Sequence, residues 1–119
     1  MAGVPRLICA AADLPDGGDA LRFELELEGV RLPAFVQRWR GQTFAYVNSC
    51  AHIPVELDWN PGRMLDDSGE YLICATHGAL YAPDSGLCVA GPCVGRSLQA
   101  LRVREENGQV FLMDGAGDE

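Results

Sequence analysis

The two histidines of this chain lie in two short clusters that each also contain a cysteine, and this arrangement strongly constrains the fold. The first cluster reads Cys50-Ala51-His52, and the second reads Cys74-Ala75-Thr76-His77. Thiolates and imidazoles are typical metal ligands, so each cluster can act as a short-range chelate. The sequence therefore predicts a fold that holds two loops together around one metal centre.

The hydrophobic pattern predicts strands almost throughout. In Leu21–Glu28 apolar and charged residues alternate strictly, as in an antiparallel strand that is buried on one face. Two hairpins are expected, one joining Ala34–Arg38 to Thr43–Val47, and one joining Leu98–Arg104 to Gln109–Met113 through Asn107-Gly108. Only Pro54–Trp59 suggests a short helix or turn. Many short strands at regular spacing predict an all-β sandwich or barrel.

Both clusters are expected at strand ends. Tyr71–Ile73 leads into the second cluster, and Ala79–Tyr81 leads away from it. The long spacer between the clusters, residues 60–69, is expected to be an exposed loop, and residues 114–119 are expected to be a frayed acidic tail. A length of 119 residues with 48% apolar residues fits a single domain over residues 1–119.

Charge and composition exclude several classes of protein. The net charge of −8 argues against binding to a nucleic acid, which requires a basic face. No apolar stretch is long enough to cross a membrane, and Met1–Arg6 lacks the order of a signal peptide. We therefore expect a cytoplasmic protein. Its five cysteines are an odd number, and a reducing compartment favours metal ligation over a disulfide framework.

Two metal centres suit this ligand set. One is a structural zinc with two sulfur and two nitrogen ligands. The other is a [2Fe–2S] cluster with one iron on two cysteines and the other on two histidines. In the binuclear centre each loop must reach both irons, which requires one cysteine and one histidine in each loop. The mixed order of the two clusters therefore favours the iron–sulfur centre.

The two clusters resemble the pattern of the Rieske iron–sulfur proteins, in which Cys-x-His is followed by Cys-x-x-His. The segment Gly86–Pro92 is similar to the third, proline-bearing loop of that family. The resemblance implies stacked antiparallel sheets with two cluster-binding loops at one end, and one [2Fe–2S] cluster. It also implies that Cys50 and Cys74 bind the inner iron, while His52 and His77 bind the outer iron.

The resemblance also implies roles for residues around the cluster. Gly78 frees the backbone after the second histidine, and Pro92 belongs to the loop that covers the cluster. Tyr81 stands where high-potential members place a tyrosine, and its hydroxyl is expected to reach the sulfur of Cys50; an ordinary packed aromatic is the alternative. Ala79 stands where those members carry a serine donor. These positions predict a low to intermediate reduction potential.

The cysteines outside the two clusters are not part of the ligand pattern. Val55 and Ala75 stand where the respiratory members carry a pair of bridging cysteines, so that bridge is absent. Cys88 and Cys93 have a spacing compatible with a disulfide, but free thiols are expected in the cytoplasm.

The resemblance implies a one-electron carrier rather than an enzyme, with no catalytic residues of its own. We expect a ferredoxin that accepts electrons from a flavin reductase and passes them to a terminal oxygenase. One alternative is a small electron-transfer subunit of a larger reductase, similar to that of nitrite reductases. Another is an interaction domain that is stabilised by zinc and has no redox role.

Overall fold

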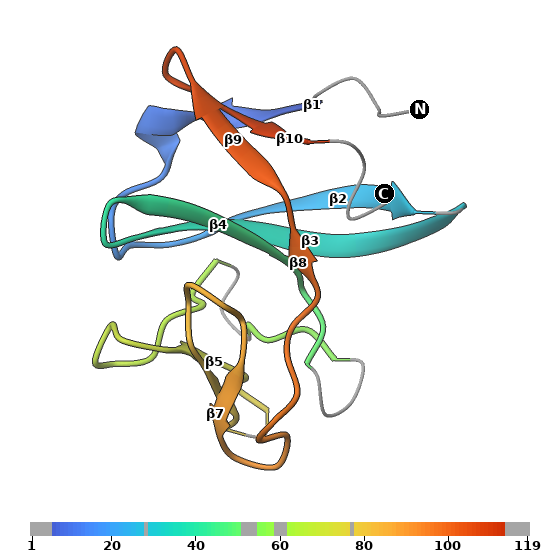
Figure 1. The fold of residues 1–119 in the computed structure, drawn as a ribbon, viewed down its shortest axis with the longest axis vertical. Helices are drawn as coiled ribbons and strands as arrows, with labels where there is room; N and C mark the ends of the chain where they lie inside the picture. The colour runs from blue at the N-terminus through green and yellow to red at the C-terminus, as the bar shows by residue number, and fades with distance from the viewer. Residues whose placement is uncertain (1–5, 28, 51–54, 59–61, 77, 114–119) are drawn as a thin grey trace.

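The computed structural model describes residues 6–27, 29–50, 55–58, 62–76 and 78–113, and these residues form three antiparallel sheets (Figure 1). The first sheet has the order β1 (Arg6–Ala10), β10 (Gln109–Leu112), β9 (Val103–Glu106). The middle sheet has the order β2 (Leu21–Leu27), β3 (Val30–Trp39), β4 (Gln42–Val47), β8 (Ala100–Leu101). The third sheet has the order β5 (Leu72–Ile73), β6 (Leu80–Tyr81), β7 (Cys88–Ala90). The all-β class with stacked antiparallel sheets is thereby confirmed.

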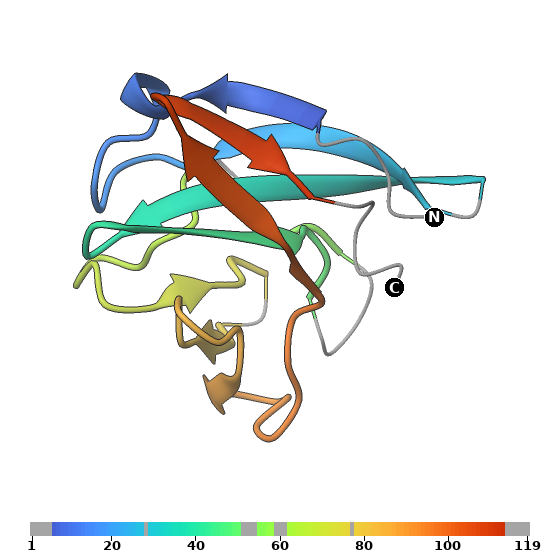
Figure 2. The same ribbon diagram turned by 45° about the horizontal axis from the view of Figure 1, so that its top comes forward.

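The middle sheet is covered on both faces, because the other two sheets lie on opposite sides of it (Figure 2). Successive side chains of a strand point to opposite faces. Ala34 and Val36 of β3 accordingly join the core beneath the first sheet, whereas Phe35 joins the core on the side of the third sheet. The core on the side of the third sheet contains Cys50 and Cys74, so the candidate site belongs to the packed interior.

Both expected hairpins form. In the first, Arg40 and Gly41 have φ of 50° and 79°, and in the second, Asn107 and Gly108 have φ of 53° and 76°. Positive φ at both central residues is what a two-residue hairpin of type I′ requires. Leu25 of β2 is buried, as the alternating pattern predicts.

The prediction of one continuous strand over Leu98–Arg104 is wrong, because the chain passes from one sheet to another within this range. β8 pairs with β4 in the middle sheet, whereas β9 pairs with β10 in the first sheet. The break falls at Arg102, between the two strands. A pattern of alternation cannot locate such a transfer, because both short strands keep the same period.

The spacer between the clusters is exposed only in part. Met64 is fully buried, and Leu65 forms an antiparallel bridge with Leu72, so this stretch packs against the third sheet. The Nε1–H of Trp39 donates to the carbonyl of Gly69 at 3.0 Å and ties the tip of the spacer to β3. Residues 55–58 form no helix, and residues 54, 59 and 114–119 lie outside the described part.

The only helix among the described residues is the three-residue 3₁₀ turn η1 (Ala11–Asp13). No helix there is therefore long and apolar enough to cross a membrane.

A buried polar network fixes the segment that follows β4. The side chain of Asn48 donates to Asp58 Oδ1 at 2.9 Å and accepts the backbone N–H of Leu57 at 2.8 Å. The second oxygen of Asp58 accepts the N–H of Gly62 at 2.9 Å and lies 3.4 Å from Nε of Arg22. Buried polar groups are stable only when they are paired, so this network fixes Asn48, which precedes Cys50, relative to Leu57 and Asp58.

We expect Asn48→Ala to lower the free energy of unfolding by about 3 kcal/mol, because it leaves the N–H of Leu57 and one oxygen of Asp58 buried without this partner. Urea denaturation followed by circular dichroism measures the change. Ser68→Ala is the control, since the Ser68 hydroxyl also binds a carboxylate but is exposed, and its effect should stay within about 0.5 kcal/mol. Equal denaturation midpoints for the two variants would contradict the role of the network.

Candidate metal centre

Cys50 is positioned by the first loop, directly after the end of β4. Its backbone N–H donates to the carbonyl of Val55 at 2.8 Å. The residue is 4% exposed, so its thiol lies in the interior. His52, expected from the sequence as a ligand in this loop, lies outside the described residues.

Cys74 is positioned by a tight turn between β5 and β6. Its N–H donates to the carbonyl of Ala79 at 2.9 Å, and its own carbonyl accepts the N–H of Gly78 at 2.7 Å. Gly78 has φ of 72°, a left-handed conformation that a residue with a Cβ adopts only with strain. The expected tight turn is therefore present, while His77 lies outside the described residues.

The structure brings the two cysteine loops together. The N–H of Ala75 donates to the carbonyl of Leu57 at 2.8 Å, so the second loop is bonded directly to the end of the first. Cys50 and Cys74 also belong to the same buried cluster of side chains. Within the described ranges no three cysteine, histidine or acidic side chains form a metal-binding group, and both expected histidines fall outside those ranges.

The hydroxyl of Tyr81 lies between two sulfur atoms. It is 3.2 Å from Sγ of Cys50 and 3.1 Å from Sγ of Cys93, and the tyrosine is fully buried. Tyr81 lies on β6, and its side chain packs in the core that contains Cys50 and Cys74. A tyrosine in this place can donate its proton to a buried thiolate, which an ordinary packed aromatic cannot do.

The third loop begins later than the sequence suggests, because Cys88–Ala90 is strand β7 and pairs with β6. A Cβ added to Gly91 would lie 2.8 Å from Cα of Ala79, so the start of this loop packs directly on the second cysteine loop. Pro92 is exposed in the turn that follows.

The cysteines of this loop face inward. Cys88 and Cys93 are buried free thiols, and their sulfur atoms are 2.9 Å apart. Burial, together with the hydrogen bond to Cys88, raises the pKa of the Cys93 thiol. Cys93 therefore keeps its proton at neutral pH and can serve as a hydrogen-bond donor.

Tyr46 supports the third loop from the middle sheet, a role that the sequence does not suggest. Its hydroxyl donates to the carbonyl of Pro83 at 2.7 Å, and burial raises its pKa, so the hydroxyl stays protonated. A Cβ on Gly86 would lie 2.7 Å from the ring of Tyr46. The sequence shows a turn at Pro83–Gly86, but not the aromatic side chain on which that turn rests.

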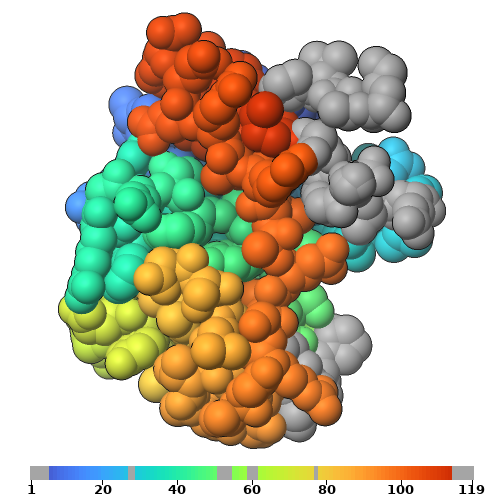
Figure 3. All heavy atoms as spheres, viewed as in Figure 1, coloured from blue at the N-terminus to red at the C-terminus, as the bar shows by residue number. Residues whose placement is uncertain are grey.

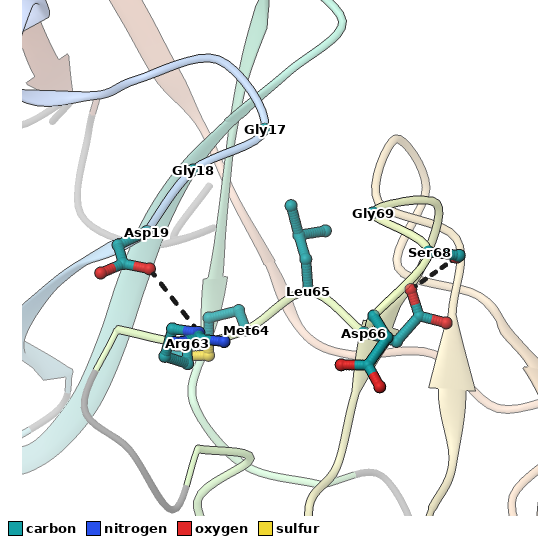
Figure 4. Close-up of a pocket in the computed structure, with 10 residues that line it drawn as sticks. Gly17, Gly18, Asp19, Arg63, Met64, Leu65, Asp66, Ser68 and Gly69 are labelled. Atoms are coloured by element: carbon teal, nitrogen blue, oxygen red, sulfur yellow. Dashed lines mark hydrogen bonds and ion pairs between the residues drawn. The ribbon is translucent and has the colours of Figure 1, made fainter.

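The structure also contains a surface hollow of about 280 Å³ (Figure 4). It is lined by the turn 17–19 and by residues 63–69. Several of its polar groups pair with each other, since Arg63 lies 4.0 Å from Asp19 and the Ser68 hydroxyl donates to Asp66 at 2.7 Å. No cysteine lines this hollow, so it does not belong to the candidate centre.

The chemistry of the donor set fits a metal with affinity for sulfur. Two buried cysteines from adjoining loops can supply thiolates, which suit zinc and iron–sulfur clusters rather than magnesium or calcium. The Tyr81 hydroxyl can stabilise negative charge on Cys50. The arrangement is therefore suited to a sulfur-bound centre shielded from water.

Several solved structures are similar to this chain in fold. One, from the complex of reduced oxygenase and oxidised ferredoxin in carbazole 1,9a-dioxygenase, has a TM-score of 0.73 and 24% identity, and the match covers 98% of each chain. The ferredoxin of carbazole 1,9a-dioxygenase from Nocardioides aromaticivorans IC177 has a TM-score of 0.69 and 19% identity, over 92% of this chain and 97% of that one. A search of curated proteins found no match.

The terminal oxygenase of carbazole 1,9a-dioxygenase from the same organism contains a similar region. It matches with a TM-score of 0.73 and 23% identity, over 97% of this chain but only 30% of the oxygenase chain. The same fold is therefore found both in a small ferredoxin and as part of a larger protein.

A family profile described as the Rieske [2Fe-2S] domain matches residues 5–110, a range that contains all three sheets and both cysteine loops. The chain therefore belongs to the Rieske [2Fe-2S] domain family and carries one [2Fe–2S] cluster.

Proposed function

We propose that Cys50 and Cys74 hold one iron of the cluster and that His52 and His77 hold the other. The two cysteines are buried on loops that are bonded to each other through Ala75, which supports their assignment to a single centre. The assignment of the histidines depends on the motif, since each follows its cysteine closely on the same loop. Tyr81, Gly78 and Pro92 are proposed to surround the cluster.

We further propose that the protein is a ferredoxin that carries one electron from a flavin reductase to a terminal oxygenase. The observation that carries this proposal is the Tyr81 hydroxyl at 3.2 Å from Cys50, in a family whose domain holds a [2Fe–2S] cluster. The likeness over nearly the full length of a chain from an oxygenase–ferredoxin complex supports the same role. The cytoplasmic location and the single domain over residues 1–119 stay predictions.

The cluster supplies the reversible uptake of one electron. The protein determines how favourable that uptake is. The Tyr81 O–H donates to Sγ of Cys50 and so stabilises the extra negative charge of the reduced state. Burial of Cys50 and Cys74 excludes water and favours the less charged, oxidised state. Ala79 supplies no hydroxyl, which keeps the potential below that of members with a serine there.

The third loop offers an apolar surface to a redox partner. Val89 is 44% exposed and Val94 is 63% exposed, and both flank the buried thiols of this loop. Figure 3 shows this segment, in orange, at the lower end of the molecule. Exposed apolar groups near a redox centre suit a short-lived complex that brings donor and acceptor close. The net charge of −8 adds attraction toward a basic partner surface.

Metal analysis tests the nature of the centre. We expect two iron and two acid-labile sulfide per chain, a visible spectrum, and an EPR signal after reduction by dithionite. A colourless product with one zinc would support the interaction domain instead. A large subunit that remains bound through purification would contradict a free carrier and favour the subunit of a larger reductase. His77→Ala, which removes a proposed ligand of the outer iron, should abolish the EPR signal.

Tyr81→Phe tests the tuning role of the hydroxyl. We expect the reduction potential to fall by about 40 mV, which corresponds to about 1 kcal/mol for one electron, because a hydrogen bond to the ligand sulfur is lost. Spectroelectrochemical titration of the purified protein measures this change. Tyr71→Phe is the control, since Tyr71 is 38% exposed and lies before β5. The reduction potential of this variant should equal that of the parent protein. An unchanged potential in both variants would remove the tuning role.

Val94→Ser tests the docking surface. We expect electron transfer from the reduced protein to a terminal oxygenase to slow about fivefold at sub-saturating oxygenase, because a side chain that is buried on docking loses apolar area. Stopped-flow absorbance measures the rate. Val30→Ser is the matched control, since Val30 is 56% exposed on the β2–β3 hairpin, in the middle sheet. Equal slowing by both substitutions would place the docking surface elsewhere.

A further inference from the structure

Two cysteines that the cluster motif does not use lie in direct contact. Sγ of Cys88, on β7, is 2.9 Å from Sγ of Cys93, in the turn that follows, and both residues are almost fully buried. A covalent S–S bond is about 2.05 Å long, so the two atoms need to approach by less than about 1 Å to form one. Two free thiols at this separation form a natural dithiol site.

The backbone around the pair favours a short closed loop. The N–H of Cys88 donates to the carbonyl of Arg96 at 2.7 Å, and the N–H of Gly95 donates to the carbonyl of Cys88 at 3.3 Å. These bonds bring the chain back on itself with the two cysteines inside the turn. A disulfide across so few residues removes little chain entropy, so it gains little stability and should be reduced readily by thiols.

The pair is connected to the proposed ligand Cys50 by one hydroxyl. Tyr81 has a single O–H proton and lies 3.2 Å from Sγ of Cys50 and 3.1 Å from Sγ of Cys93. The S–H of Cys93 donates to Sγ of Cys88, so the sulfur of Cys93 is a second acceptor for the Tyr81 proton. The S–H of Cys88 has an acceptor of its own, the carbonyl of Ala90 at 3.3 Å. In the reduced pair, the sulfur of Cys93 therefore competes with Sγ of Cys50 for the single Tyr81 proton.

We propose that Cys88 and Cys93 form a reversible disulfide, and that Tyr81 transmits this change to Cys50. In the disulfide Cys93 no longer donates a proton, so its sulfur is a poorer acceptor and the Tyr81 hydroxyl donates more fully to Cys50. The stronger bond stabilises the reduced cluster more, and the reduction potential rises. The transmission, though not the disulfide, rests on the proposed function, in which Cys50 is a cluster ligand.

The oxidant is a small disulfide such as glutathione disulfide. The thiolate of one cysteine attacks it to give a mixed disulfide and one glutathione, and the second cysteine then displaces the second glutathione. The protein loses two protons and two electrons, which the two departing glutathione molecules carry away as thiols. The sulfur atoms are buried, so the reaction requires local opening of the turn, whose outer residue Val94 is 63% exposed.

The first experiment measures the disulfide itself. Purified protein with its cluster is equilibrated without oxygen in mixtures of reduced and oxidised glutathione, the remaining thiols are alkylated, and intact mass and peptide maps are recorded. We expect the loss of two hydrogens, a linked peptide containing Cys88 and Cys93, and full reversal in reduced glutathione. Cys9→Ser, which changes a cysteine in the other core, should behave like the parent protein.

Two outcomes of that experiment would overturn the proposal. One is alkylation of both thiols at every glutathione ratio. The other is a stable glutathione adduct on a single cysteine with no linked peptide. The mass measurement does not depend on the identity of the metal, so it gives an answer even if the protein proves to hold zinc. Failure of the proposed function would instead appear as the absence of iron, sulfide and the EPR signal.

The second experiment measures the transmission. In the disulfide form we expect the equilibrium constant for one-electron reduction to rise about threefold to tenfold, where tenfold corresponds to about 59 mV. In Tyr81→Phe the disulfide should still form, but the potential should be the same with and without it. Cys88→Ser, which cannot form the bond and keeps the Cys93 thiol, should hold the potential of the reduced parent. A shift of equal size in Tyr81→Phe would overturn the role of the hydroxyl.

Discussion

The candidate centre depends on the two hydrogen bonds made by the carboxamide of Asn48. It joins the end of β4 to Leu57 and Asp58, and so fixes both ends of the first cysteine loop. The carbonyl of Leu57 then receives the N–H of Ala75 and positions the second loop. A displacement at Asn48 would therefore be passed to both loops. The described residues of the two loops contain little regular structure, so the precision of the centre comes from side chains at the bases of the loops.

Much of the fold follows from local sequence signals. The alternation of β2 and the turn residues Arg40-Gly41 and Asn107-Gly108 act over a few neighbouring residues, and the structure contains the elements that they predict. The resemblance to the family rested on the spacing of cysteine and histidine, and the family assignment is confirmed. These signals are readable because each acts within one turn or one strand.

The parts that the sequence did not predict depend on contacts between distant segments. Met64 lies in a stretch rich in turn residues, yet it is fully buried because the spacer folds back on the third sheet. Asn48 and Asp58 resemble ordinary loop residues until their pairing is seen. Gly91 is identifiable as a turn glycine, but its close approach to Ala79 is a tertiary contact. Single-residue patterns carry no information about such partners.

The third loop combines two properties on opposite sides of one turn. Val89 and Val94 face solvent, while Cys93 contacts the Tyr81 hydroxyl and Cys88 contacts Cys93. A partner that covers the outer side would hold the turn closed and limit the opening that an oxidant needs, since binding to the closed state lowers the population of the open one. Conversely, a disulfide that altered the turn would alter the docking surface. Because the proposed docking surface and the proposed disulfide share one short turn, partner binding and thiol oxidation would be coupled, and the coupling would act in both directions.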